Sequence, residues 1–157
     1  MKKIYSVEGI LNKGFVGQIA YTICLDQSYE GMSISFDFDK QYLEDVTEDI
    51  KKQFIIDCRG NYTAHTANDA CLIDALKHTK TELQIVITMN DKFIGGVHRQ
   101  DNPKHIHFSK TYTTEGCIPQ ESIHGVLRIT VIAFSVIQDH THYHLSLFAH
   151  AKEANHV

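Results

Sequence analysis

The chain has 157 residues, of which 43% are hydrophobic and 22% are charged, and its formal net charge is −4. This length predicts a single domain over residues 1–157, large enough to bury roughly two thirds of the surface of the unfolded chain. Domains that bind nucleic acid usually carry a strongly basic surface, so the acidic balance predicts that nucleic acid is not a partner.

The compartment is indicated by the lack of membrane signals and by the cysteines. No apolar run reaches the ~18–20 residues that are needed to cross a bilayer. The N-terminal segment 1–9 lacks the apolar centre of a signal peptide. The cysteines are widely spaced and form no Cys-x-x-Cys motif, which predicts reduced thiols in a cytoplasmic protein without a membrane partner: they are Cys24, Cys58, Cys71 and Cys117.

The first third of the chain alternates between apolar and polar residues, as strands with one solvent-exposed face do. Strands are predicted over 4–12, 15–26 and 32–39. The inward row of the third strand comprises Met32, Ile34, Phe36 and Phe38. Because short turns connect the three strands, we expect them to pair in order as an antiparallel meander.

The period then changes to that of helices. Asp45 and Glu48 form a capping-box pattern, which predicts a helix over 45–58 that ends before Gly60. Asn68 is a suitable N-cap for a second helix over 69–78.

Alternation returns after residue 81 and continues to the end of the chain. Further strands are predicted over 82–89, 93–99, 105–113, 125–137 and 141–150. The segment 125–137 is apolar on both faces except at Arg128, which predicts a central strand covered on both sides.

Together these elements predict an α+β domain. Its sheet is mostly antiparallel with about eight strands, and two helices inserted between the third and fourth strands cover one face. A sheet curled into a barrel is the alternative.

Histidines are the most prominent chemical feature, since the chain has 11 of them. Alternate side chains of a strand point the same way, with Cβ atoms about 6–7 Å apart, so a His-x-His pair can supply two metal ligands. The sequence therefore predicts a site for zinc or a similar divalent metal, with His140 and His98 as further candidates. The predicted metal ligands are His105, His107, His142 and His144.

Two alternatives remain open. The segments His107-x-Ser109 and His144-x-Ser146 resemble the paired His-x-Ser/Thr motifs of 2H phosphoesterases, although they lie closer together than in that family. This resemblance implies metal-free acid–base chemistry by His107 and His144.

The other alternative is a non-catalytic module whose histidines are incidental. It would bind a small molecule or a protein in an apolar pocket with lining residues such as Tyr21, Phe36, Phe38 and Phe134. Self-association through an exposed strand is a further expectation. The sequence indicates neither a substrate nor whether the protein is an enzyme.

Overall fold

The structure, a computed structural model, describes residues 1–61 and 67–150. Within these residues it confirms an α+β fold of mostly antiparallel strands, with two helices between the third and fourth strands. The elements are β1 (Lys2–Leu11), β2 (Gly17–Cys24), β3 (Gly31–Phe38), α1 (Glu48–Asn61), α2 (Asp69–Lys77), β4 (Glu82–Met89), β5 (Lys92–Val97), β6 (Lys104–Ser109), β7 (Val126–Ser135) and β8 (Thr141–His150).

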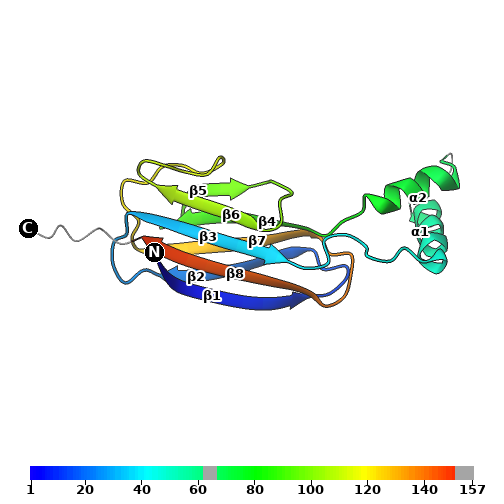
Figure 1. The fold of residues 1–157 in the computed structure, drawn as a ribbon, viewed down its shortest axis with the longest axis horizontal. Helices are drawn as coiled ribbons and strands as arrows, with labels where there is room; N and C mark the ends of the chain where they lie inside the picture. The colour runs from blue at the N-terminus through cyan, green and yellow to red at the C-terminus, as the bar shows by residue number, and fades with distance from the viewer. Residues whose placement is uncertain (62–66, 151–157) are drawn as a thin grey trace, which may run out of the picture.

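The strands form two four-stranded sheets that pack against each other as a sandwich (Figure 1). We call the sheet of order β1-β8-β3-β6 the histidine sheet and the sheet of order β2-β7-β4-β5 the second sheet. Both sheets are open, so the barrel alternative is not adopted. The predicted meander of the first three strands is wrong, because β1 pairs with β8 and β2 pairs with β7. Alternation along a strand determines which face is buried, but it does not determine which strand lies alongside.

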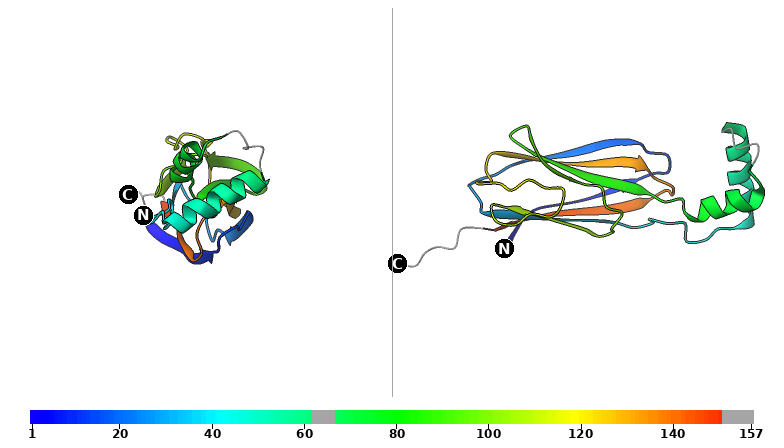
Figure 2. Two further views of the ribbon diagram at one scale, coloured as in Figure 1. Left: turned by 90° about the vertical axis from the view of Figure 1, so that its right-hand side faces the viewer. Right: turned by 90° about the horizontal axis from the view of Figure 1, so that it is seen from above.

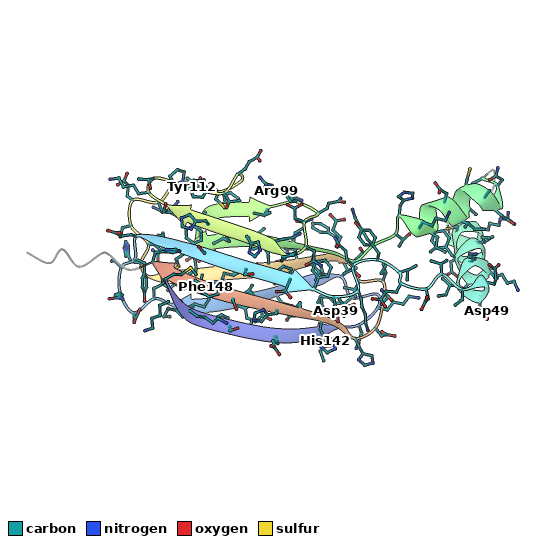
Figure 3. All side chains as sticks on the ribbon, in the orientation of Figure 1. Asp39, Asp49, Arg99, Tyr112, His142 and Phe148 are labelled. Carbon is teal, nitrogen blue, oxygen red and sulfur yellow. The ribbon has the colours of Figure 1, made fainter. Side chains whose placement is uncertain are left out.

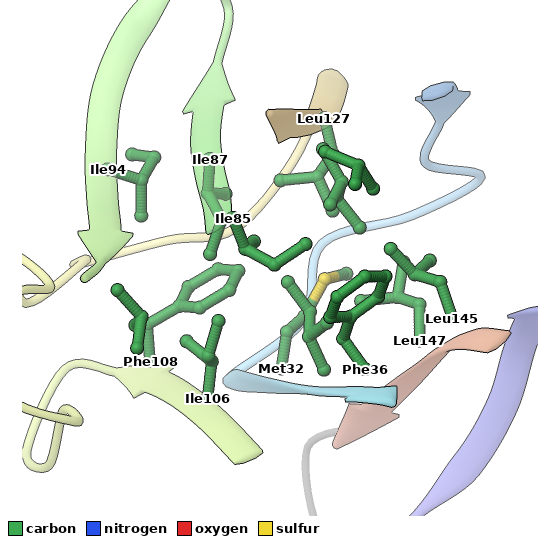
Figure 4. Close-up of a cluster of buried hydrophobic side chains, with 14 of the residues drawn as sticks. Met32, Phe36, Ile85, Ile87, Ile94, Ile106, Phe108, Leu127, Leu145 and Leu147 are labelled. Atoms are coloured by element: carbon green, nitrogen blue, oxygen red, sulfur yellow. The ribbon is translucent and has the colours of Figure 1, made fainter. Parts of the chain in front are cut away.

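The inward rows of both sheets meet in one hydrophobic core (Figure 4). The predicted inward row of β3 is confirmed, with Phe36 0% exposed, and Leu145 and Leu147 of β8 are likewise 0% exposed. Because Phe36 lies in this packed interior and Phe134 is 50% exposed on the outer face, the expected pocket that includes both residues does not form.

Strand β7 is central in its sheet, but only one of its faces is buried. Leu127, Ile129 and Val131 point into the core, whereas Val126 and Phe134 are exposed. The prediction of cover on both sides is wrong because the helices do not lie over this sheet. The apolar outward residues of β7 face solvent instead.

The two helices, which we call the helical hairpin, lie crosswise and project together from one end of the sandwich, beyond the ends of the strands (Figure 2). The prediction that they cover a sheet face is therefore wrong. Leu72 and Leu76 of α2 are buried, yet neither belongs to the hydrophobic core of the sandwich. No helix in the described part of the chain is long and apolar enough to cross a membrane.

The helix starts are decided by capping side chains. The Asn68 prediction is confirmed, because its side-chain oxygen accepts a hydrogen bond from the Cys71 amide at 2.8 Å. Helix α1 begins at Glu48, three residues later than expected, because the Thr47 hydroxyl accepts the hydrogen bond from the Ile50 amide at 3.3 Å. Thr47, rather than Asp45, therefore caps α1.

The pair Gly95-Gly96 in β5 allows a close backbone approach and supplies a matched test. A Cβ added at Gly95 would lie 2.5 Å from the Cys117 sulfur, whereas one added at Gly96 would meet nothing closer than 3.7 Å. We expect Gly95→Ala to lower the free energy of unfolding by about 1–3 kcal/mol through overpacking. Urea unfolding measures the effect, and an equal or larger loss in Gly96→Ala would contradict it.

Candidate functional site

The two predicted histidine ladders lie on the outer face of the same sheet. His105 and His107 are on β6, and His142 and His144 are on β8. Strand β3 separates them, pairing with β6 on one side and with β8 on the other. The ladders therefore share a face but are not adjacent.

The register also displaces the ladders along the strands. Ser35 of β3 pairs with His105, whereas His144 pairs with Asp37, two residues further along β3. The backbones of strands two apart are separated by roughly 10 Å across the sheet, so rings of the two ladders could share an ion only by leaning toward each other over β3. Among the described residues, no three His, Cys, Asp or Glu side chains gather in a geometry that could hold a metal ion. Metal binding by the four ladder residues stays a prediction.

At the end of the sheet nearest the helices, His144 joins a hydrogen-bonded chain of polar side chains. Its Nδ1 lies 3.4 Å from Asp37 Oδ2, and its Nε2 lies 3.0 Å from Ser6 Oγ and 3.1 Å from Ser146 Oγ. If Nδ1 carries the ring proton, it donates a hydrogen bond to the Asp37 carboxylate, and Nε2 accepts a hydrogen bond from a serine hydroxyl. In this order of groups the carboxylate orients the ring, and the ring can take a proton from the hydroxyl.

A hollow of about 290 Å³ beside His144 limits what this arrangement can do. Two of its lining residues, Asp39 and His142, lie at the end of the sandwich nearest the helices (Figure 3). Its lining includes the carboxylates of Glu8, Asp37 and Asp39 as well as His142. A phosphate ester, or an oxyanion that forms during acyl transfer, would face three negative charges here. The electrostatics therefore do not favour the phosphoester chemistry that the His-x-Ser resemblance implies.

The opposite end of the same face holds a second cluster, made of Ser33, His107 and His150. Ser33 Oγ lies 2.9 Å from His107 Nδ1 and 3.0 Å from His150 Nε2, so both rings point at one hydroxyl. The ring centroids of His107 and His150 are 5.2 Å apart, and those of His107 and Tyr112 are 5.4 Å apart. Burial and the neighbouring His150 lower the pKa of His107.

The remaining histidines of residues 1–61 and 67–150 do not join these clusters. His140 precedes β8 in a turn with φ of 54°, so it is not the third member of the ladder. His98 packs against Phe134 of the second sheet and is not beside His105. His65 and His156 lie outside the described residues.

A separate cleft lies between the helical hairpin and the end of the sandwich. Its volume is about 570 Å³. Residues from five separate parts of the chain line it: Lys13, Gly14, Leu43, Glu44, Asp45, Ile50, Gln53, Phe54, Asp57, Leu76, Thr79, Val136, Ile137 and Gln138.

Helix α1 presents one side to this cleft. Ile50, Phe54 and Asp57 follow one another at spacings of four and three, which places them on one face of a helix. Ile56 lies off that face and is 61% exposed. Without strands beneath it, the apolar side of α1 borders the cleft.

Hydrogen bonds hold the base of the hairpin against the connection between β7 and β8. The Gln138 side-chain amide donates to the Tyr42 carbonyl at 3.0 Å, and the Ser135 hydroxyl donates to the Lys80 carbonyl at 2.7 Å. Tyr42 and Lys80 also form a β-bridge with each other. Both connections to the hairpin are thus fixed to each other and to the end of the sandwich, beside the cleft that Gln138 helps to line.

The rim of the cleft is acidic. Its lining contains the carboxylates of Glu44, Asp45 and Asp57 but a single ammonium group, that of Lys13. An apolar wall with three carboxylates is complementary to a ligand that is both apolar and positively charged.

Sequence reasoning missed the cleft, together with Ser33 and His150 as partners of His107. The cleft residues carry no motif, because their proximity arises from the orientation of the hairpin. Ile50 and Phe54 are four residues apart in the sequence, which indicates one apolar side of the predicted helix, but the helices were predicted to cover a sheet face.

Comparison with known proteins identifies a protein family for this chain. No curated protein and no solved structure matches this chain. The model of a Family of unknown function (DUF6669) matches residues 1–154, and the chain belongs to this family.

Proposed function

We propose that the protein is a non-catalytic binding module that takes an amphipathic, positively charged ligand into the cleft between the helical hairpin and the sandwich. The observation that carries this proposal is the lining of the cleft, in which apolar side chains are bordered by more carboxylates than ammonium groups. A binding site needs only such a complementary surface, so this function requires no convergent catalytic groups.

The apolar part of the ligand would pack against Ile50, Phe54 and Ile137. Ile50 is 37% exposed, so a bound apolar group would remove further hydrophobic surface from water. The cationic part would lie near Glu44 and Asp57. A peptide segment with leucine on one side and lysine on the other has both properties.

The free cysteines support a cytoplasmic setting for this function. All four cysteines are unpaired, and Cys24 and Cys71 are exposed. Exposed free thiols are compatible with a reducing compartment, whereas disulfides are typical of secreted domains.

A labelled amphipathic peptide of leucine and lysine tests the proposal by fluorescence anisotropy. We expect the wild-type protein to bind it, and Phe54→Ala to weaken binding about tenfold or more through lost apolar burial. Ile56→Ala is the matched control, because Ile56 lies on α1 outside the cleft. A peptide with glutamate in place of lysine should bind much more weakly because of the acidic rim.

Two results would contradict the proposal. Equal affinity for the lysine and glutamate peptides would show that the acidic rim does not select the ligand. An equal loss in Phe54→Ala and Ile56→Ala would show that the cleft is not where the peptide binds.

A further inference from the structure

We propose that His107 and His150 form a binding site for one divalent transition-metal ion of the zinc type, at the end of the histidine sheet away from the helices. This pair differs from the ladder pairs that the sequence indicates, because His150 replaces His105 as the partner of His107. The proposal is independent of the ligand cleft, which lies beyond the opposite end of the sandwich.

The geometry of the two rings carries this inference. His107 Nδ1 and His150 Nε2 lie 2.9 and 3.0 Å from the same atom, Ser33 Oγ, so their ring nitrogens converge on one point. Two imidazoles that bind one tetrahedral zinc ion through nitrogens at about 2.0–2.1 Å have centroids roughly 5 Å apart. The observed centroid separation is 5.2 Å.

The strands explain why this pair converges and the ladder pairs do not. Ser33 of β3 pairs with His107 of β6, and the preceding residue of the same outward row, Gly31, pairs with His150 of β8. Gly31 has no side chain, so the two histidines can lean toward each other over β3. His105, opposite Ser35, and His144, opposite Asp37, have the same two-residue offset, but Asp37 has a side chain, and its Oδ2 lies 3.4 Å from His144 Nδ1.

The Ser33 hydroxyl occupies the point at which an ion would bind, and it can turn away because it is only partly buried. Each neutral ring can carry its proton on its other nitrogen, which leaves the converging nitrogens free to bind the ion. Imidazole ligands suit zinc, copper and nickel. The remaining coordination positions would be filled from the adjacent hollow of about 470 Å³, which Ser33, His107 and Tyr112 help to line.

Calorimetric titration of tag-free protein with Zn²⁺ tests this site. We expect one ion per chain, with binding weakened at least about tenfold by either His107→Ala or His150→Ala. His105→Ala is the matched control, since it removes an exposed imidazole from the same strand and face, and it should bind as the wild type does. Ser33→Ala should keep the ion, because the hydroxyl is displaced rather than required.

The outcomes that overturn the proposal are distinct. The proposal is overturned if both His107→Ala and His150→Ala bind Zn²⁺ with wild-type affinity. It is also overturned if His105→Ala loses as much Zn²⁺ affinity as those two variants do. Imidazole ¹H–¹⁵N spectra of the wild-type protein provide a test that does not depend on any variant folding. Zn²⁺ should change the ¹⁵N chemical shifts of His107 Nδ1 and His150 Nε2. Chemical-shift changes confined to His142 and His144 would overturn the assignment.

Discussion

Phe108→Ala is expected to lower the free energy of unfolding by about 3–5 kcal/mol, a large share of the 5–15 kcal/mol typical of a domain. Phe108 lies on β6, is 0% exposed and packs between the two sheets (Figure 4). Alanine would leave a cavity at the edge of the core, because the rigid strands on either side cannot close over it. Urea unfolding followed by circular dichroism measures the loss.

Phe134→Ala is the control for this substitution. The same side chain is removed from the outer face of β7, where Phe134 is 50% exposed, so the change should stay below about 1 kcal/mol. Similar losses in the two variants would mean that the interior between the sheets is not the main source of stability.

Removal of the helical hairpin is expected to abolish peptide binding and leave the sandwich folded. Tyr42 and Lys80 form an antiparallel bridge, so a two-residue Asn-Gly turn can join them in place of residues 43–79. The sandwich core contains no helical residue, which is why its stability should be retained. The cleft, by contrast, loses Ile50 and Phe54 along with its acidic rim.

Two measurements together check this deletion. Circular dichroism should show loss of the helical signal with a cooperative unfolding transition still present. Peptide anisotropy should show no binding at concentrations that saturate the wild-type protein. A deletion variant that is unfolded would mean that the hairpin is needed for the sandwich, and one that binds normally would place the ligand site elsewhere.

The elements of the fold were predictable from local patterns, but their arrangement was not. The alternation of Met32, Ile34 and Phe36 identifies the buried side of β3, because each inward position is apolar. The same alternation is compatible with any neighbouring strand, so it gave no indication that β8 and β6 flank β3. The partners are chosen by packing across the whole sandwich, which brings together strands far apart in sequence.

The histidine prediction shows a related limit. The period of two correctly indicates that His142 and His144 point to the same side, and likewise His105 and His107. Convergence of imidazoles from different strands depends on register and on the residue between them, as Gly31 and Asp37 illustrate. Neither can be deduced from the spacing of histidines along the chain.

The orientation of the helices, which creates the cleft, could not be predicted from the sequence. The stripe of Ile50 and Phe54 predicts an apolar helix side that needs a partner, and a sheet face is the usual one. Here the hairpin extends past the sheets and the same stripe lines an open cleft. Amphipathicity indicates that a surface will be covered, but it does not identify what covers it.

The most direct test of the binding function is a map of the cleft by NMR. Methyl groups of Ile50, Ile137 and Leu76 are observed while the leucine–lysine peptide is added, with Ile56 as the reference outside the cleft. The proposed function predicts saturable shifts of the three cleft methyls and little change at Ile56. Saturable shifts confined to other surfaces, or none at any concentration, would contradict it.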